Sequence, residues 1–193
     1  TSLLVVEDSR SVRVLLCEHL RQLGGFTIET AGTLAEARTL IATDPGRFFC
    51  AVLDLNLPDA PSGEVVDEVA ACGIPIVVLT GTVDEDVRQA MLARRIVDYS
   101  IKRNANDIEH VAYIVGRLRE NRATKVLIVE DSPSFRAYLA SLLDRYCYHT
   151  LQAENGRVAM EVLARNPDTA LVITDVNMPE MDGFELINAI RAT

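Results

Sequence analysis

Short apolar runs alternate with amphipathic stretches along the first two-thirds of the chain. The apolar runs, bounded by Gly, Pro or Asp, cover residues 3–6, 26–30, 49–53, 76–79 and 97–101. Three of them are almost continuously apolar, which is typical of parallel strands buried on both faces. Between the runs, apolar residues recur at i, i+3 and i+4, a spacing that predicts helices. The alternation predicts a (βα)5 domain, in which helices cover both faces of an open parallel sheet.

The predicted helices cover residues 12–23, 34–41, 64–72, 87–94 and 108–118, and the third of them is short. The last one is expected to run to about residue 121, with Asn106 or Asp107 placed to cap its N-terminus. His19 lies on the apolar face of the first helix, so we expect a packed core histidine. The pair Arg94–Arg95 is interpreted as a solvated helix end, where cations interact favourably with the helix dipole.

The same pattern then restarts. Further strands are predicted at residues 126–129, 150–153 and 170–174, and helices at 135–143, at 158–164 and from about 184. The acidic pair that ends the first strand recurs 123 residues later (Asp8 and Asp131), and the acid after the third strand recurs after 121 (Asp54 and Asp175). We interpret residues 1–122 as a complete unit and 123–193 as the N-terminal (βα)3 part of a homologous one. We expect the last helix to continue past Thr193, and the short linker to restrict the relative orientation of the units.

Composition narrows the class of protein. The chain has a formal net charge of −9, with 13 basic and 18 acidic residues in 1–122 and 6 and 10 in 123–193. Two acidic halves argue against nucleic acid or an anionic membrane as the main partner. No apolar run is long enough for a membrane helix and no signal peptide opens the chain, so we expect a cytoplasmic protein. The four cysteines lack metal-ligand spacing and are interpreted as reduced, mostly buried thiols.

Polar residues follow the predicted strands where a parallel sheet binds its ligands, beyond the carboxyl ends. Glu7 and Asp8 follow the first strand, Asp54 the third, Thr80 ends the fourth, and Lys102 follows the fifth. Three crowded carboxylates repel one another unless a cation joins them, and a hard-oxygen set suits Mg²⁺. An Asp beside a metal, a lysine and a hydroxyl can accept a phosphoryl group, because these groups neutralise and bind its oxygens.

At these residues the chain resembles two tandem receiver domains of bacterial response regulators, which have a flavodoxin-like doubly wound fold. The resemblance implies that Asp54 is the phosphoacceptor, that Asp8, Asp54 and the carbonyl of Asn56 hold Mg²⁺, and that Glu7 acts largely through water. It also implies switch roles for Thr80 and Tyr99 and a phosphoryl contact for Lys102. The second copy matches through Glu130, Asp131, the acceptor position Asp175 and Asn177, followed by MPEMDG at residues 178–183.

The first copy departs from the family pattern in three places. Its loop after Asp54 reads LNLPDAPSG, one residue longer before Gly63 than the equivalent loop before Gly183. Its third helix is short. Arg103 follows Lys102 where the family usually has a proline, and a cis bond is cheap only before proline. The expected placement of Lys102 and the efficiency of the first site depend on the Lys102–Arg103 peptide bond.

The resemblance implies phosphorylation by a histidine kinase or a histidine phosphotransfer protein, with no enzymatic turnover in the receivers themselves. By family analogy, an output domain such as a diguanylate cyclase is expected beyond residue 193. The incomplete second sheet predicts a homodimer or a domain swap through its exposed edge, and Tyr113 is a candidate interface anchor.

Three alternatives stay open. An Mg²⁺-dependent phosphatase with an Asp nucleophile would need a second Asp where the chain has Asn56 and Asn177. A flavin or nucleotide binder would need a Gly- or Ser/Thr-rich phosphate loop in place of Glu7 and Asp8. A pseudo-receiver would only regulate or dimerise.

Overall fold

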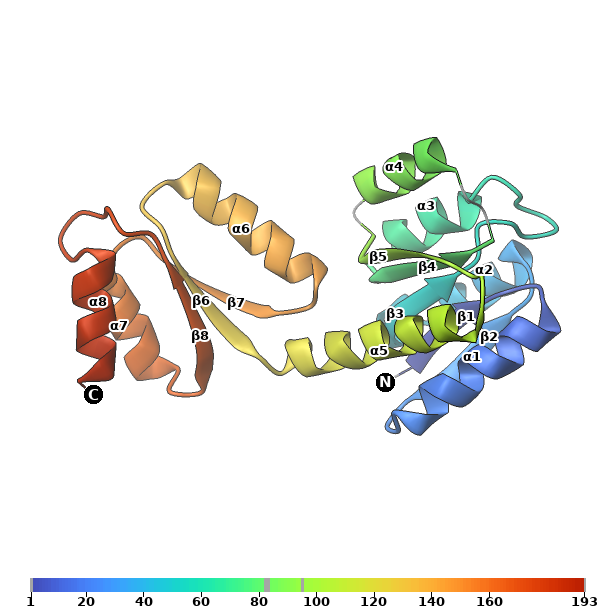
Figure 1. Ribbon diagram of the computed structural model, residues 1–193, viewed down its shortest axis with the longest axis horizontal. Helices are drawn as coiled ribbons and strands as arrows, with labels where there is room; N and C mark the ends of the chain where they lie inside the picture. Colours follow the sequence, from blue (N-terminus) through green and yellow to red (C-terminus); the bar gives the residue numbers. More distant parts are fainter. Residues whose placement is uncertain (1, 82–83, 95, 193) are drawn as a thin grey trace. The chain divides into compact units, whose positions relative to one another are not determined.

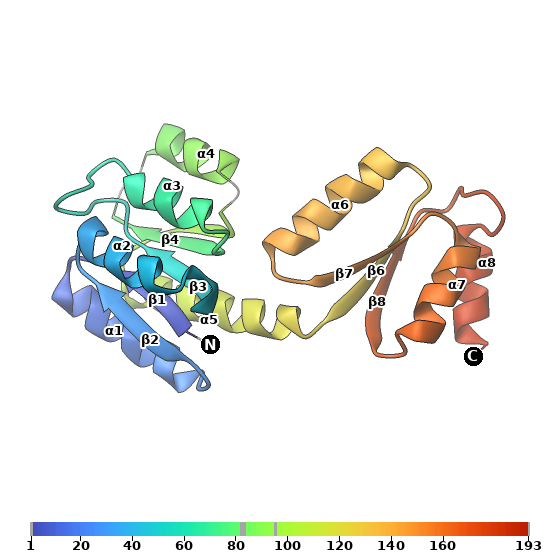
Figure 2. The ribbon, with the colours of Figure 1, turned by 180° about the vertical axis from the view of Figure 1, so that it is seen from behind.

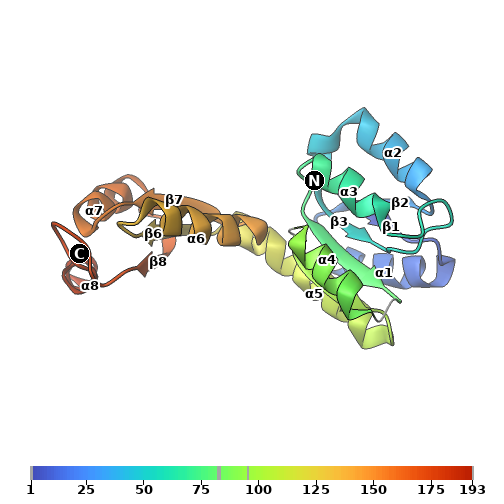
Figure 3. The same ribbon diagram turned by 90° about the horizontal axis from the view of Figure 1, so that it is seen from above.

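The computed structural model describes residues 2–81, 84–94 and 96–192. The chain divides into two compact units, Thr1–Arg117 and Leu118–Thr193. Helix α5 (Ala105–Arg122) leads into strand β6 (Lys125–Val129) with no long connecting loop (Figure 3). Within the described residues, none of the helices combines the length and apolar character needed to cross a bilayer.

The first unit is a five-stranded parallel sheet in the order β2-β1-β3-β4-β5. Its strands are β1 (Ser2–Val6), β2 (Thr27–Ala31), β3 (Phe48–Leu53), β4 (Ile76–Thr80) and β5 (Asp98–Ile101). Its other helices are α1 (Arg10–Gln22), α2 (Leu34–Thr43), the 3₁₀ turn η1 (Pro45–Arg47), α3 (Glu64–Ala71) and α4 (Glu85–Ala93). Helices α1 and α5 lie on one face and α2, α3 and α4 on the other (Figures 1 and 2). The predicted (βα)5 fold is confirmed.

Burial of the strands follows their place in the sheet. Every residue of β3 and β4 is buried, because each has a neighbouring strand on both sides and helices on both faces. The edge strand β2 carries polar residues and is only partly buried. These positions explain why β3 and β4 read as nearly continuous apolar runs whereas β2 does not.

The second unit is a three-stranded parallel sheet in the order β7-β6-β8, which confirms the predicted (βα)3 arrangement. Its further elements are α6 (Pro133–Arg145), β7 (His149–Ala153), α7 (Gly156–Arg165), β8 (Thr169–Thr174) and α8 (Gly183–Arg191). Helix α6 covers one face and α7 and α8 the other (Figures 1 and 2). Strand β8, the equivalent of β3, is an edge strand here and has no fully buried residue.

Three expectations about single positions need correction. His19 is half-buried rather than a core residue. Cys17 and Cys50 are buried, as expected, but Cys72 is exposed and Cys147 only half-buried, because each lies just beyond the end of a helix.

The ends of two helices, α5 and α8, also differ from expectation. Helix α5 begins at Ala105, and its first turn is capped by the Asn104 side chain, which accepts the N–H of Asn106 at 2.9 Å. Helix α8 ends at Arg191, while Thr193 lies outside the described residues. Arg94 is the exposed C-cap residue of α4, as expected of a solvated helix end, and it also forms a surface ion pair with Asp67 (2.7 Å), while Arg95 lies outside the described residues.

Candidate functional site

Hydrogen bonds between strand ends bring the predicted polar residues of the first unit together. The N–H of Asp54 donates to the carbonyl of Val6 at 2.9 Å, which places the residue after β3 beside the end of β1. The N–H of Lys102 donates to the carbonyl of Thr80 at 2.8 Å, which does the same for β5 and β4. Because all four strands run parallel, their carboxyl ends meet at one edge of the sheet.

Three carboxylates cluster at this edge. Oxygen atoms of Glu7, Asp8 and Asp54 lie within 4.8 Å of one another. Glu7 and Asp54 are only 2% and 3% exposed, whereas Asp8 is exposed to solvent. The cluster therefore combines two buried acids with one accessible acid at the mouth of the site.

Lys102 provides the positive charge that two buried carboxylates require. Its Nζ donates to Oδ2 of Asp54 at 2.7 Å and to both carboxylate oxygens of Glu7 at 2.8 and 3.0 Å. The Lys102–Arg103 peptide bond is trans, as are the other described peptide bonds. Lys102 thus reaches the site without a proline after it.

The pKa values of two groups in this cluster, Glu7 and Lys102, are shifted from their usual values. Burial raises the pKa of Glu7, although the hydrogen bond from Lys102 opposes that rise. Burial alone would lower the pKa of Lys102, but its hydrogen bonds to Asp54 and Glu7 outweigh that effect and raise it. The ammonium form of Lys102 is therefore favoured.

The donor set fits a hard divalent cation. Oδ1 of Asp54 is buried and has no hydrogen-bond partner among the described residues, while Oδ2 is held by Lys102. A buried carboxylate oxygen without a partner is costly unless a ligand satisfies it. Together with the oxygens of Glu7 and Asp8, it forms the acidic cluster typical of a metal site in this kind of fold.

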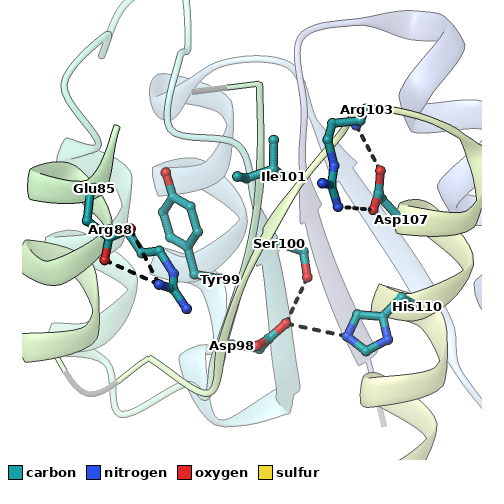
Figure 4. Close-up of a pocket in the computed structure, with 9 residues that line it drawn as sticks. All are labelled: Glu85, Arg88, Asp98, Tyr99, Ser100, Ile101, Arg103, Asp107 and His110. Carbon is teal, nitrogen blue, oxygen red and sulfur yellow. Dashed lines mark hydrogen bonds and ion pairs between the residues drawn. The ribbon is translucent and has the colours of Figure 1, made fainter. Parts of the chain in front are cut away.

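The two other predicted site residues lie on adjacent strands. Thr80 is fully buried at the end of β4 and is paired in register with Ile101 of β5. Tyr99 on β5 is 8% exposed, and burial raises the pKa of its phenol. Figure 4 shows Tyr99 pointing toward α4, while Asp98 and Ser100 of the same strand point toward α5.

The second unit repeats the acidic cluster. Oxygens of Glu130, Asp131 and Asp175 lie within 4.8 Å of one another at the ends of β6 and β8. The N–H of Asp175 donates to the carbonyl of Val129 at 2.9 Å, as Asp54 does to Val6. The single lysine of this unit, Lys125, begins β6 at its opposite end and pairs with Asp168 at 2.8 Å. Here no lysine balances the acids.

Comparison with known proteins decides the family. Residues 3–112 and 126–193 match the family described as "Response regulator receiver domain". The chain belongs to this receiver family. A solved "putative two-component system response regulator/ggdef domain protein" is 34% identical, with a TM-score of 0.88 over 99% of this chain and 77% of the other.

Further relatives match parts of the chain. "Chemotaxis protein CheY1" of Helicobacter pylori (strain J99 / ATCC 700824) is 45% identical over 69 residues, which are 35% of this chain and 56% of that protein. The chain thus spans about half the length of the first curated relatives it matches. The "Mn(2+)-bound form of response regulator Rcp1" is 27% identical, with a TM-score of 0.52 over 57% of this chain and 88% of the other.

The unusual loop after Asp54 in the first receiver is anchored in a way the sequence did not reveal. Leu57 and Ala60 form an antiparallel bridge and are both buried. Asp59 between them accepts the N–H groups of Leu34 and Ala35 at 2.9 and 3.0 Å, so it caps α2 from the far side of the loop. In the second receiver the equivalent Glu180 instead pairs with Arg157 at 3.1 Å.

The extra residue in this loop is absorbed at its glycine. The N–H of Gly63 donates to the carbonyl of Leu55 at 3.1 Å, as that of Gly183 does to Val176 at 3.0 Å. Gly63 has φ +79°, a conformation that favours glycine, whereas Gly183 is the first residue of α8. Both loops therefore reach the same closing hydrogen bond despite their different lengths.

Sequence reasoning also missed an arginine in each receiver. The guanidinium of Arg13 donates to the main-chain carbonyl of Glu7, and that of Arg136 donates to the carbonyl of Glu130. Both arginines stand five residues after the second acid of the pair. The recurrence of SRSVR as SPSFR was the available signal.

Proposed function

We propose that the first receiver is a phosphorylation switch whose Asp54 accepts a phosphoryl group from a phosphohistidine of a kinase or phosphotransfer protein. The observation that carries the proposal is the position of Lys102, whose ammonium nitrogen touches both Asp54 and Glu7. This arrangement supplies a nucleophilic carboxylate, a fixed positive charge and two further acids within a few ångströms.

The reaction needs no general base, because the carboxylate of Asp54 is already a nucleophile. One of its oxygens would attack phosphorus, an O–P bond would form, and the electron pair of the breaking P–N bond would return to the donor imidazole. Asp8, Asp54 and the carbonyl of Asn56 would hold Mg²⁺, with Glu7 acting largely through water, and the cation would neutralise charge on the phosphoryl oxygens. Lys102 would contact these oxygens from the other side.

The conformational change that follows phosphorylation of Asp54 would involve Thr80 and Tyr99. The hydroxyl of Thr80 would donate to a phosphoryl oxygen on Asp54, and any shift of Thr80 reaches β5 through the paired residue Ile101. Tyr99, two residues before Ile101, borders a cavity of about 350 Å³ between α4, β5 and α5 (Figure 4). Phosphorylation would change the population of Tyr99 conformations and remodel this face.

The second receiver has its own acceptor, Asp175, with Glu130, Asp131 and the carbonyl of Asn177 as metal ligands. The equivalence of its acidic cluster to that of the first receiver supports this assignment. Asn56 and Asn177 stand where an Asp-nucleophile phosphatase would need an acid, so we favour accepted phosphate over turnover of external substrates.

We infer that the receivers control an output domain in a longer protein. Two solved relatives that cover 99% of this chain are described as response regulator/GGDEF domain proteins, with TM-scores of 0.88 and 0.87. Their descriptions support a diguanylate cyclase as the controlled activity, with pairing of two copies of the chain as the means of control.

Beryllofluoride, a mimic of the phosphoryl group, tests this function. Purified chain should bind beryllofluoride only with Mg²⁺ present, and Asp54→Asn and Asp175→Asn should each abolish binding at their own site. Asp86→Asn removes an exposed acid of α4 and should change nothing. Unchanged binding in both acceptor variants would refute the proposal, and loss in only one would show which receiver is competent.

A further inference from the structure

Each receiver holds the peptide group between its two acids with an arginine from the following helix. Arg13 donates through Nη1 to the carbonyl oxygen of Glu7, six residues earlier, and Arg136 donates in the same way to Glu130. Both arginines are half-buried. A hydrogen bond from a charged donor to a backbone carbonyl is stronger than a neutral one.

The recurrence of this contact in both receivers distinguishes Arg13 and Arg136 from ordinary surface arginines. Arg13 and Arg136 are equivalent at an offset of 123, the same offset that relates Asp8 to Asp131. Arg10, three residues earlier, is replaced by Pro133 in the second receiver, and it is exposed. An arginine therefore recurs only at the position from which the guanidinium reaches the carbonyl.

The bond completes a set that fixes the backbone of the acidic pair. The N–H of Glu7 donates to the carbonyl of Ala31 at 3.0 Å, and the N–H of Ser9 donates to Oε1 of Glu7 at 3.1 Å. Arg13 holds the remaining carbonyl, that of the Glu7–Asp8 peptide. The orientation of this peptide sets the direction in which the side chain of the exposed Asp8 leaves the backbone.

The same three bonds occur in the second receiver. The N–H of Glu130 donates to the carbonyl of Ala153 at 3.1 Å, the N–H of Ser132 donates to Oε1 of Glu130 at 3.1 Å, and Arg136 holds the carbonyl of Glu130.

A glycine lies beside the guanidinium in the first receiver. A Cβ added to Gly32 would lie 3.2 Å from Nη1 of Arg13, which is tighter than about nine in ten Cβ contacts. The φ of Gly32 is not in the left-handed region, so its backbone conformation does not demand glycine. The equivalent residue of the second receiver is Glu154, and Arg136 still makes the same bond, so the contact does not require a small residue at this position.

We propose that Arg13 and Arg136 are positioning residues that fix the acidic pair for metal binding and hence for phosphoryl transfer. The inference rests on the proposed function and extends it to residues outside the metal-ligand set. Each arginine acts through the Glu–Asp peptide group. Partners that orient metal ligands commonly contribute about 10- to 100-fold to metal affinity.

The direction in which Mg²⁺ affinity changes when Arg13 is replaced distinguishes a positioning role from a purely electrostatic one. Arg13 carries a positive charge near three carboxylates, so removing a charge alone should strengthen cation binding. Losing a group that orients Asp8 should weaken it. A weaker affinity after removal of a nearby positive charge has no purely Coulombic explanation.

The affinity test uses the full chain with Asp175→Asn, so that only the first site binds metal. Mg²⁺ is titrated by calorimetry into this protein and into R13M, R13K and R10M versions of it. R13M keeps an unbranched side chain for packing but removes the donors, and we expect about tenfold weaker binding. R13K, which retains a charged donor, should recover part of the loss. R10M removes an equal charge from an exposed site and should bind at least as tightly as the parent.

A second measurement uses the metal-free protein. Amide hydrogen exchange at Asp8 and Ser9 should become faster in R13M and stay unchanged in R10M, because only Arg13 holds this turn. R13M that binds Mg²⁺ as tightly as its parent, or more tightly, would overturn the inference and leave the proposed function intact. A parent that binds no Mg²⁺ would overturn both.

Discussion

The ammonium nitrogen of Lys102 lies 2.7 Å from Oδ2 of Asp54, although the two residues follow strands that are not neighbours. Strand β4 lies between β3 and β5, so the lysine side chain extends across the end of β4 to reach the acceptor. In the metal-free protein this ammonium is the counter-charge of Asp54 and Glu7. It therefore stabilises the fold at the position where it would later contact a phosphoryl group.

Lys102→Met should destabilise the metal-free first receiver and make it more dependent on Mg²⁺. Removing one partner of a buried ion pair typically costs about 3–5 kcal/mol, and we expect about 2–3 kcal/mol here because Lys102 keeps some exposure. Urea unfolding with and without Mg²⁺ measures the loss, which should shrink with Mg²⁺ because the cation replaces the missing charge. A loss that Mg²⁺ leaves unchanged would contradict this account.

The pH dependence of that variant has a defined sign. The pKa of Lys102 is raised above its usual 10.5, so its contribution is fully present below about pH 10.5 and is lost as the pH rises through the folded-state value. The stability difference between the wild-type protein and Lys102→Met should therefore decrease in strong alkali. It should also decrease in acid, because burial raises the pKa of Glu7 and a protonated Glu7 needs no counter-charge. Lys125→Met, which removes an ion pair at the opposite end of β6, is the matched control.

The fold was predictable because buried parallel strands give continuous apolar runs, whereas amphipathic helices give apolar residues at every third or fourth position. Residues of the site were predictable because strand ends in such a sheet converge, which requires no knowledge of side-chain conformation. The effect of Arg103 on the position of Lys102 depends on the three-dimensional path of the lysine side chain. A long flexible side chain reaches Asp54 from a trans peptide bond.

Contacts between side chains and backbone groups that only the folded chain brings together were not predictable from the sequence. Asp59 caps a helix that begins 25 residues earlier, whereas sequence rules for caps consider only the adjacent residues. Arg13 looks like an ordinary helix-surface residue until the turn at Glu7 is folded beneath it. His19 has the spacing of a core position, but its side of α1 is only partly covered.

Asp59→Ala should destabilise the first receiver at neutral pH. The N–H groups of Leu34 and Ala35 lower the pKa of Asp59 below its usual 3.8, so its contribution is present above about pH 3.8 and is lost as the pH falls through the lower folded-state value. Chemical unfolding at pH 7 and at pH 3 or below should show a difference from wild type that shrinks in acid. Asp86→Ala serves as the control, and an acid-independent difference would argue against the charged cap.

Gly183→Ala should damage the second receiver. A Cβ at Gly183 would lie 2.2 Å from the carbonyl oxygen of Asp175 and 3.1 Å from the Cα of Val176, both of which are backbone atoms that cannot rotate away. We expect a loss of about 1–3 kcal/mol and weaker metal binding at Asp175. Gly116→Ala in α5 meets only Leu23 at 3.4 Å and should instead stabilise by about 0.8–1 kcal/mol. Equal effects of the two substitutions on thermal unfolding would contradict the steric argument.

Cys147→Gly should stabilise the second receiver. Cys147 has φ 64°, and the equivalent residue of the first receiver is Gly24 with φ 65°. A left-handed conformation costs a non-glycine residue about 1–2 kcal/mol, of which the greater freedom of glycine in the unfolded chain cancels part. We expect a net gain of about 0.5–1 kcal/mol in thermal or urea unfolding. Cys72→Gly, at φ −88°, should be destabilising.

The open edge of the second sheet should drive association of the chain at high concentration. Leu171 on β8 is 51% exposed, whereas every residue of the equivalent strand β3 is buried beside β4. An unpaired strand edge with exposed apolar side chains favours pairing with another chain, and a lysine there opposes it. In sedimentation experiments we expect Leu171→Lys to shift the chain toward monomer, while Val14→Lys, at a position 49% exposed on α1, should leave association unchanged. Equal association of the wild-type protein and Leu171→Lys would place the self-association surface elsewhere.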